Sequence, residues 1–487
     1  MLPDDITPTL PQLPRFPTGV SGLDTVLGGG LLTGDSYLVT GAPGTGKTTL
    51  GNQLAFAHAA GGGSAIIATL LTETHDRMLA HLRGFRFVDP TVIGERLRYL
   101  SLLNALQAGG LDAVLAELSP MVREYGATLL VIDGAGVASA VASSGLDLGH
   151  FIHGLQARTA LLGCTTVLLA GSQEAISAET HVDGVLHLVN ERVGSRDLRS
   201  LRVVKLRGSR YLSGRHDLTI GLDGIAVFPR LEAVFAELMP TWQTPDERVA
   251  FGVPLLDGML AGGLVVGSST LLLGTPGAGK TLLGLHFLAE GARRGEPGLI
   301  ASFQETAPAL TATADRAGLA LGAHVDSGLI RVLWRAPLQV SPDEWAWQLL
   351  AAVEEHQPRR LVIDAFTDLV RLFADPERQA AFAQALANAL RDRGVISLFL
   401  LEIDTFVGPQ LAASVPTVSG IMDSGILLRT VELDSEWHRL VSVLKHRQTA
   451  ADLTIREFTI GPQGIVVGES FAATGLLTGS AVPALPA

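Results

Sequence analysis

The chain has 487 residues, of which 47% are hydrophobic and 17% charged, and its formal net charge is -12. This length predicts two or three domains with ample cores, and the composition excludes a disordered chain. The excess of acidic residues also disfavours a dedicated nucleic-acid-binding protein, which usually carries a basic domain, so we expect no nucleic-acid partner.

The cysteine content and the two ends of the chain bear on location. Cys164 is the single cysteine and lies in the apolar run "LLGCTTVLLA", so we expect a buried, inert thiol and no disulfide within one chain. The start, "MLPDDITPTLPQLPRF", lacks the basic residues and apolar run of a signal peptide. The stretch 470–487 is less apolar than the roughly 20-residue span that a bilayer needs. We therefore expect a reducing, cytoplasmic setting without membrane attachment.

The first motif with chemical meaning is "GAPGTGKTT" at 41–49. It fits G-x-x-x-x-G-K-[ST], the loop whose backbone N–H groups surround nucleotide phosphates, whose lysine neutralises the outer phosphates and whose hydroxyl binds Mg²⁺. An apolar strand pattern (36–40) precedes it and a helical pattern (48–60) follows, which is the context that the motif requires. The predicted ATP-binding residues are Gly41, Gly44, Thr45, Gly46, Lys47, Thr48 and Thr49.

Short apolar runs continue through the first half at 65–70, 128–133 and 165–171, with a helical pattern at 110–126 among them. Runs of this kind, bounded by glycine or polar residues, are typical of buried parallel strands. Strands that alternate with helices predict a doubly wound α/β sheet covered on both faces. Asp133 ends one of these strands, at the sheet edge where we expect it to bind Mg²⁺ together with Thr48.

The whole half occurs twice. Residues 19–49 align without a gap with residues 252–282, and each aligned pair lies 233 positions apart. A period this long indicates a duplicated domain and not a solenoid of short repeats. The predicted domains are 1–240 and 241–487.

The second half repeats every candidate residue of the first. Thr281 and Asp364 are the expected Mg²⁺ ligands there. Water attack also needs a carboxylate to orient or deprotonate the water, and Glu73 and Glu305 each follow a strand, 25–26 residues beyond the loop lysine. A solvated loop glutamate is the alternative for both. The predicted ATP-binding residues of the second half are Gly274, Gly277, Ala278, Gly279, Lys280, Thr281 and Leu282.

A Lys/Arg pair ends a strand-like run late in each half. The pairs are Lys205 with Arg207 and Lys445 with Arg447. Alternate residues of a strand point the same way, so each pair can project from one face of a sheet. An ordinary exposed pair of charges is the alternative.

Taken together, these residues resemble the KaiC family, the double-domain RecA-superfamily ATPases of bacterial circadian clocks. The resemblance covers nearly the whole chain and rests on the "GLDxxLxGGL" lead-in, the tandem phosphate loops, the "KLRGS" element and "REFTIGPQGIVV" (456–467). It implies an α/β fold of two tandem RecA-like P-loop NTPase domains, with ATP and Mg²⁺ as ligands.

The same resemblance implies a homohexameric ring that hydrolyses ATP at its subunit interfaces. The Lys/Arg pairs would act in trans on the γ-phosphate of the neighbouring subunit. Serine/threonine autokinase activity would belong to the second half, and regulatory partners of the KaiA and KaiB type would be expected.

The chain departs from the family pattern in three places, one of which is Gln448 in "KHRQT", where the family has glycine. The family's Glu-Glu pair after the second strand is Thr72-Glu73 in the first half and Gln304-Glu305 in the second, so its first member, the usual base, is absent. The family's adjacent Ser-Thr phosphoacceptors fall on the stretch "VSGIMD", which leaves Ser419 as the candidate acceptor.

The leading hypothesis is therefore an ATP-hydrolysing ring that serves as a nucleotide-driven regulator or timer. A RecA-like DNA-handling ATPase is one alternative, which the net charge of -12 disfavours. A nucleotide-gated scaffold with little turnover is another, which the missing base residues favour.

Overall fold

The chain divides into two compact units, Met1–Ala233 and Val234–Ala487. The boundary predicted near residue 240 falls within residues 236–246, outside the part that the structure describes. The computed structural model describes residues 13–70, 75–136, 145–171, 178–193, 196–235, 247–336, 340–373, 375–403, 422–433, 435–447, 451–471, 473–474 and 482–483.

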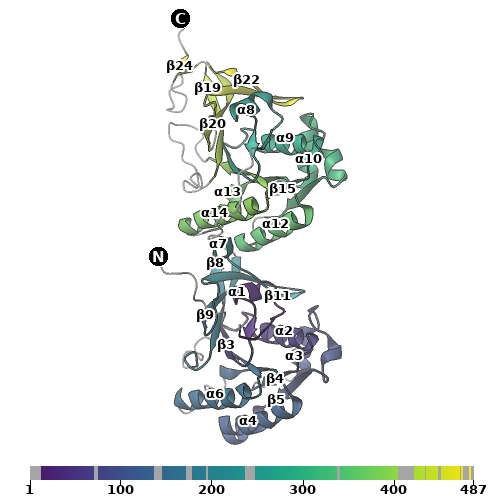
Figure 1. Ribbon diagram of the computed structural model, residues 1–487, viewed down its shortest axis with the longest axis vertical. Helices are drawn as coiled ribbons and strands as arrows, with labels where there is room; N and C mark the ends of the chain where they lie inside the picture. The colour runs from purple at the N-terminus through teal and green to yellow at the C-terminus, as the bar shows by residue number, and fades with distance from the viewer. Residues whose placement is uncertain are drawn as a thin grey trace, which may run out of the picture. The chain divides into compact units, whose positions relative to one another are not determined.

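The first unit alternates strands with helices and then ends in consecutive strands (Figure 1). Its elements are β1 (Arg15–Phe16), α1 (Leu23–Val26), β2 (Leu31–Leu32), β3 (Ser36–Gly41), α2 (Lys47–Ala60), β4 (Ala65–Thr69), α3 (His75–Leu82), the 3-10 helix η1 (Pro90–Val92), β5 (Leu97–Ser101), α4 (Leu103–Tyr125), β6 (Leu129–Asp133), α6 (Gly145–Ala160), β7 (Thr165–Ala170), β8 (Gly184–Val193), β9 (Arg196–Leu206), β10 (Arg215–Gly221) and β11 (Gly224–Phe228). The short helix α7 (Leu231–Phe235) follows.

One 9-stranded sheet organises this unit, in the order β11-β10-β9-β8-β3-β7-β6-β4-β5. The strands from β8 to β5 run parallel, and β9, β10 and β11 extend the sheet in antiparallel fashion. The parallel strands are buried on both faces, because α2 and α3 share an apolar core with one face and α4 and α6 share a core with the other. The helices therefore cover the faces of the parallel strands but not the ends of these strands.

The second unit repeats this arrangement. Its elements are β12 (Arg248–Val249), α8 (Pro254–Met259), β13 (Leu264–Val265), β14 (Ser269–Gly274), α9 (Lys280–Arg293), β15 (Gly298–Ser302), α10 (Ala307–Arg316), α11 (Leu321–Asp326), β16 (Ile330–Trp334), α12 (Pro342–His356), β17 (Arg360–Asp364), α13 (Phe366–Val370), α14 (Pro376–Asp392), β18 (Ile396–Glu402), β19 (Ser424–Leu433), β20 (Glu436–His446), β21 (Arg456–Gly461), β22 (Gly464–Ser470), β23 (Ala473–Thr474) and β24 (Val482–Pro483).

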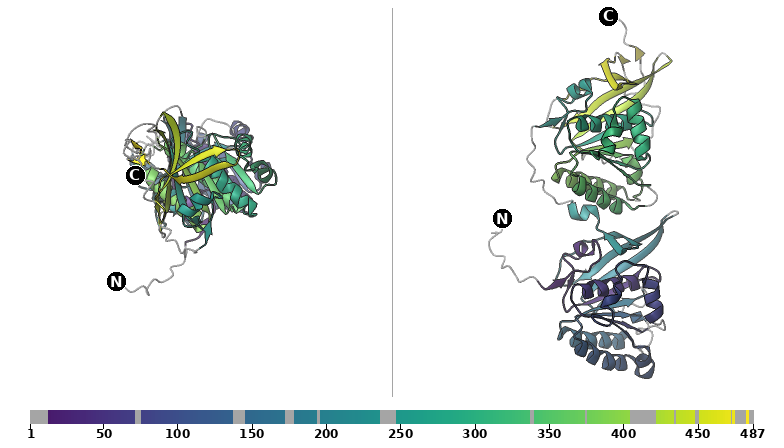
Figure 2. Two further views of the ribbon diagram at one scale, coloured as in Figure 1. Left: turned by 90° about the horizontal axis from the view of Figure 1, so that it is seen from above. Right: turned by 90° about the vertical axis from the view of Figure 1, so that its right-hand side faces the viewer.

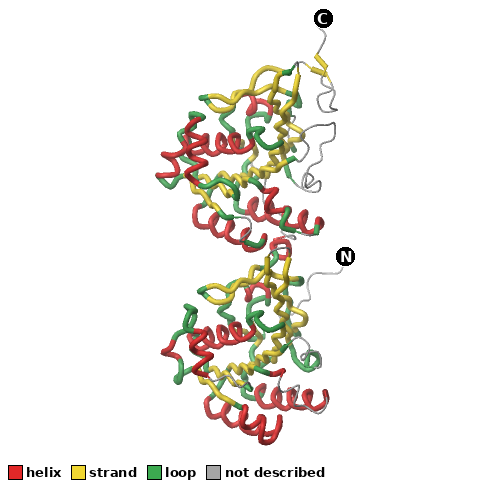
Figure 3. The backbone as a smooth tube through the Cα atoms, turned by 180° about the vertical axis from the view of Figure 1, so that it is seen from behind, coloured by secondary structure: helices red, strands yellow, loops and turns green. Residues whose placement is uncertain are grey.

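Its sheet has 9 strands in the order β16-β15-β17-β18-β14-β19-β20-β21-β22, with the same parallel part and the same antiparallel extension. The extension is yellow-green to yellow in Figure 2. Figure 3 shows helices on both sides of the strands in each unit. Two mostly parallel sheets with flanking helices confirm the predicted fold, a tandem pair of RecA-like α/β domains. None of the described helices combines the length and apolar character needed to cross a membrane.

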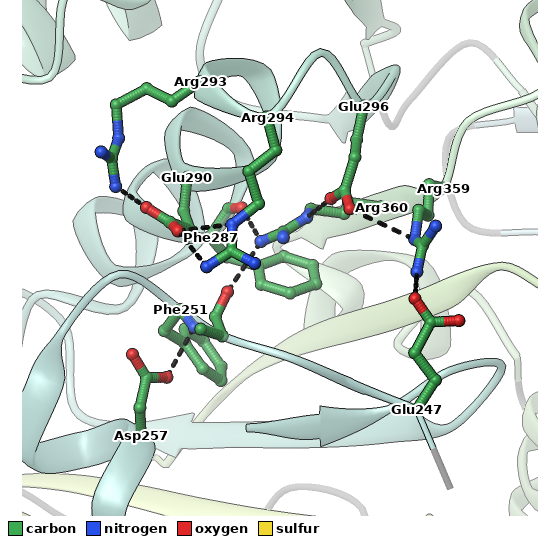
Figure 4. Close-up of polar contacts among 11 residues, drawn as sticks. Glu247, Phe251, Asp257, Phe287, Glu290, Arg293, Arg294, Glu296, Arg359 and Arg360 are labelled. Carbon is green, nitrogen blue, oxygen red and sulfur yellow. Dashed lines mark hydrogen bonds and ion pairs between the residues drawn. The ribbon is translucent and has the colours of Figure 1, made fainter. Parts of the chain in front are cut away.

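A buried charge distinguishes the core of the second unit from that of the first. Arg360, at the start of β17, is 0% exposed and lies with its guanidinium 4.8 Å from the ring centre of Phe287 (Figure 4). It donates to Glu296 Oε2 at 2.7 Å, to Phe287 O at 2.7 Å and to Ala250 O at 2.8 Å. The repeat places Leu129 at this position of the first unit. The hydrogen bonds of Arg360 thus join the start of the unit to α9. They lie at the amino-terminal end of β17.

The helix that follows each glycine-rich loop is joined to the edge hairpin of its sheet by a side chain six residues after the loop lysine. In the first unit the backbone N–H of Ile225 donates to Gln53 Oε1 at 2.7 Å. In the second unit the N–H of Ile465 donates to His286 Nε2 at 2.8 Å. Burial lowers the pKa of His286 to about 4, because a charged ring would lose both solvation and its role as acceptor.

The His286→Gln variant should lose the acid sensitivity of this contact. The folded pKa of about 4 lies below the ordinary 6.5, so the unfolded wild type binds more protons and its stability falls as the pH drops from 6.5 to 4. The loss should reach roughly 3 kcal/mol, and the glutamine should avoid it as Gln53 does. Denaturant unfolding at pH 7 and pH 4.5 tests this, and identical pH dependence in both proteins would contradict it.

Candidate functional site

Each glycine-rich loop joins the central strand of its sheet to a helix through a left-handed glycine. Gly46 precedes α2 with φ 103°, and Gly279 precedes α9 with φ 99°. A Cβ on Gly46 would lie 2.8 Å from Ile220 Cδ1 of the edge hairpin. Glycine is therefore required both by the backbone angle and by the close packing of the hairpin. The loop amides at the start of each helix are the groups that bind phosphate.

The loop lysines fold back onto the loops that precede them. Lys47 Nζ donates to Gly41 O at 2.7 Å and Ala42 O at 2.9 Å. Lys280 Nζ donates to Gly274 O at 2.9 Å and to the next carbonyl at 3.0 Å. Burial lowers the pKa of Lys280, so its ammonium needs these oxygens or equivalent anionic ones. Both lysines thus lie where the outer phosphates of a nucleotide would be bound.

A threonine and an aspartate come together beside each lysine. Thr48 Oγ1 donates to Asp133 Oδ2 at 2.7 Å, and Thr281 Oγ1 donates to Asp364 Oδ2 at 2.9 Å. Burial, and next the nearby Glu305 carboxylate, raise the pKa of Asp364 to about 6. Hydroxyl and carboxylate oxygens suit Mg²⁺, which usually completes its shell with phosphates and water. Among the described residues, no group of three or more His, Cys, Asp or Glu is placed to hold a metal ion.

Glu305 and Gln304 differ in what they contact. The backbone N–H of Glu305 donates to Ser302 Oγ at 3.1 Å, and the Glu305 carboxylate lies close enough to Asp364 to raise its pKa. Gln304 is exposed and donates from Nε2 to Asp368 Oδ2 at 2.8 Å. Of the two residues, Glu305 is thus the one whose carboxylate charge acts on Asp364, the expected Mg²⁺ ligand. Glu73 lies outside the described residues.

The other candidates are placed as follows. Thr45 Oγ1 donates to Ala42 O at 2.8 Å within the loop, and the N–H of Ala278 donates to the carbonyl of residue 275 at 3.1 Å. Thr49 and Leu282 belong to the first turns of α2 and α9. Ser419 lies outside the described residues. Cys164 is 0% exposed and burial raises its thiol pKa to about 12, which confirms the predicted inert thiol.

The Lys/Arg pair of the first half lies near the amino-terminal ends of the parallel strands, whereas its own loop lies at their carboxyl ends. Lys205 pairs with Val185 of β8, and Val185 pairs with Leu38 of β3, three residues before Gly41. At about 3.3 Å per residue and about 4.8 Å per strand, the Cα of Lys205 lies on the order of 14 Å from that of Gly41. An intrachain action of Lys205 on the first loop is therefore ruled out by distance.

Both residues of this pair contact their own chain. Lys205 Nζ donates to Val182 O at 2.6 Å and to Glu179 O at 3.1 Å, and Arg207 forms an ion pair with Asp183 at 3.6 Å. Burial, followed by the neighbouring Arg207, lowers the pKa of Lys205. The pair is thus held in place at the sheet edge.

The second half places its pair in the same way. Lys445 pairs with Gly425 of β19, which pairs with Leu271 of β14, three residues before Gly274. The backbone N–H of Arg447 donates to Asp423 O at 2.9 Å, as that of Arg207 does to its equivalent aspartate at 3.0 Å. Sequence reasoning missed these aspartates. Each of them directly precedes the parallel strand, β8 or β19, that lies beside the central strand in the sheet.

Comparison with known proteins gives one family and a set of similar relatives. The family model "ATPase: KaiC" matches residues 16–232 and again 249–471. The chain is 27% identical to the circadian clock oscillator protein KaiC of Picosynechococcus sp., over 94% of this chain and 90% of that protein. It is 26% identical to the KaiC protein of Rippkaea orientalis, over 94% and 89%, and to KaiC 1 of Synechocystis sp., over 95% and 91%.

The variants Lys47→Ala and Lys280→Ala should each remove one of two ATP sites, because each lysine supplies the positive charge of its loop. Isothermal titration of the full chain with Mg-ATP should give two nucleotides per wild-type chain and one per variant chain. Arg86→Ala, which removes a cation that is 71% exposed, is the matched control and should leave two. A wild-type stoichiometry of one would contradict the prediction.

Proposed function

The chain belongs to the KaiC ATPase family, and we propose that it binds Mg-ATP in both halves and hydrolyses ATP at the subunit interfaces of a homohexamer. The observation that carries this proposal is the occurrence of the complete arrangement twice. In each half a loop lysine contacts the loop carbonyls, and a threonine contacts the aspartate at the end of a strand.

Different residues of each site would bind the phosphates and the Mg²⁺ ion. Loop amides and the two lysines bind and orient the phosphates, so that the γ-phosphate points toward the carboxyl ends of the parallel strands. Mg²⁺, bound through Thr48 and Asp133 or through Thr281 and Asp364, would neutralise charge on the phosphates.

The attacking water needs a carboxylate as general base. Glu305 is the proposed base of the second half, since its carboxylate helps to raise the pKa of Asp364, whereas Gln304 cannot accept a proton usefully and is hydrogen-bonded to Asp368. Glu73 is the proposed base of the first half by the repeat, and it lies outside the described residues. An amide can orient water without accepting its proton, so Gln304 contributes less to hydrolysis than a glutamate would.

The proposed ring follows from the position of the Lys/Arg pairs. Because Lys205 lies on the order of 14 Å from Gly41 of its own chain, we place it away from the nucleotide of its own first loop, and membership of the family favours a nucleotide bound by the neighbouring subunit. ATP would then join two subunits and stabilise their interface. Regulatory proteins of the KaiA and KaiB type are the partners that this family membership suggests.

Assembly should depend on nucleotide and on the Lys/Arg pairs. We expect hexamers with Mg-ATP, and we expect Lys205→Ala to weaken them, because the contact of its ammonium with the neighbour's phosphates is lost. Mass photometry at micromolar protein measures this, with Arg215→Ala, an exposed cation paired with Glu191, as the control. A wild-type monomer under saturating ATP would refute the trans arrangement.

Turnover in the second half should depend on Glu305. In the Lys47→Ala chain, which has only the second site, Glu305→Gln should lower the ATPase rate by about 100-fold or more. Gln304→Glu, which restores the family's pair, should raise it. Steady-state phosphate release with ATP binding checked separately tests both, and Glu73→Gln in the Lys280→Ala chain tests the first half. An unchanged rate in Glu305→Gln with normal binding would refute the assignment of Glu305, and the base would then be another residue; a negligible wild-type rate with normal binding would favour a nucleotide-gated scaffold.

Autokinase activity of the second half is the remaining part of the proposal. Ser419 is the candidate acceptor, and we expect phosphate on it after incubation with Mg-ATP because the family's acceptors fall there. Phosphopeptide mass spectrometry of wild type and Ser419→Ala measures this. Phosphate on another residue, or none, would refute the assignment.

A further inference from the structure

Glu402 is a carboxylate of the second site that neither the loop motif nor the Mg²⁺ ligands include. It ends β18, which lies between the loop strand β14 and the strand β17 of Asp364. The parallel register sets Glu402 directly beside Gly274. The carbonyl oxygen of Gly274 accepts Lys280 Nζ at 2.9 Å and also the backbone N–H of Ile403 at 3.1 Å. One oxygen thus joins the loop lysine to the residue after Glu402.

The strand alternation places Glu402 on the nucleotide side of the sheet. Leu398 and Leu400 alternate with it along β18, and both belong to the core that packs against α9, the helix that starts at Lys280. Asp364 is on the same face, because Val362 belongs to the same core. Glu402 therefore lies on the strand between Asp364 and the loop, on the same face as Asp364 and two residues beyond its level.

Two contacts define this position further. The backbone N–H of Glu402 donates to Oγ1 of Thr367 at 2.7 Å, and Thr367 is 0% exposed, so the strand end is fixed. The charge of Glu402 acts on the loop lysine: burial lowers the pKa of Lys280, and the carboxylates of Glu402 and Asp364 oppose that shift. Glu402 thus offsets part of the positive charge that binds phosphate.

The first half carries no carboxylate at the equivalent position. Ala170 pairs with Thr40 just as Leu401 pairs with Leu273, so the position equivalent to Glu402 is Gly171. The two halves share the lysine, threonine and aspartate but differ in this one charge. The difference bears on how each site treats a highly charged ligand.

We propose that Glu402 makes the second site discriminate against the γ-phosphate, so that it binds ATP less tightly relative to ADP than the first site does. This inference rests on the proposed binding of ATP at both sites. An incoming γ-phosphate has to share Lys280 with Glu402 and brings like charges within a few ångströms of each other. ADP carries less charge at that end and is less affected.

The test compares nucleotide affinities in the Lys47→Ala chain, in which the second site alone binds. Glu402→Gln should tighten binding of a non-hydrolysable Mg-ATP analogue about tenfold and that of Mg-ADP about threefold or less. Glu402→Gly, which copies the first half, should act in the same direction. Glu355→Gln, an equal change of charge at an exposed position of α12, is the control and should change neither affinity.

The possible outcomes distinguish a failure of this inference from a failure of the proposed function. An unchanged ratio of ATP to ADP affinity in both Glu402 variants overturns the inference and leaves the proposed function intact. Normal affinities with lost turnover also overturn it, because Glu402 would then act on the water. A Lys47→Ala chain without any nucleotide binding overturns the proposed function of the second half, and the inference with it.

Discussion

Each half of the molecule is organised around a lysine ammonium held where a strand turns into a helix. A cation in this partly buried place needs anionic or carbonyl oxygens, and here the loop carbonyls supply them. Because parallel strands all end at one edge of a sheet, their terminal residues surround the same ammonium. For this reason Asp133 lies near the loop of the first half, and Asp364, Glu305 and Glu402 lie near the loop of the second, although these residues are far apart in sequence.

The duplication has kept the fold while the charges have diverged. Gln53 and His286 fulfil the same hydrogen bond to the edge hairpin, one without and one with a titratable group. Leu129 is replaced by the buried Arg360 in the second unit, which needs Glu296 and two carbonyls to compensate its charge. Glu402 is a further position at which the second half has a charged or titratable side chain where the first half has an uncharged one. Sensitivity to pH and to ligand charge is therefore expected to concentrate there.

The sequence predicts most of the fold and the binding part of the site, because glycine spacing and apolar periodicity are local properties. The loops and the burial of Cys164 could be read from a few adjacent residues. The contact of a threonine with an aspartate about 85 positions away depends on strand order, which the repeat indicates but does not specify. Glu402 belongs to no motif, and only the register of β18 against β14 reveals its place. Glu73 stays a prediction from the repeat, and Ser419 stays one from the family pattern.

The polarity of the sheet explains why such a chain would act as a ring. Gly41, the first glycine of the loop motif, ends the central strand, while Lys205 lies near the end of an antiparallel strand two places away and thus near the amino-terminal ends of the parallel strands. Under the proposed function, a subunit built in this way gives a cation to one neighbour and receives one from another, which makes a head-to-tail interface. Repetition of such an interface closes into a ring when the rotation permits. Under the proposed function, nucleotide occupancy and assembly are then one equilibrium, so a carboxylate such as Glu402 that weakens ATP binding would also loosen the contact between subunits.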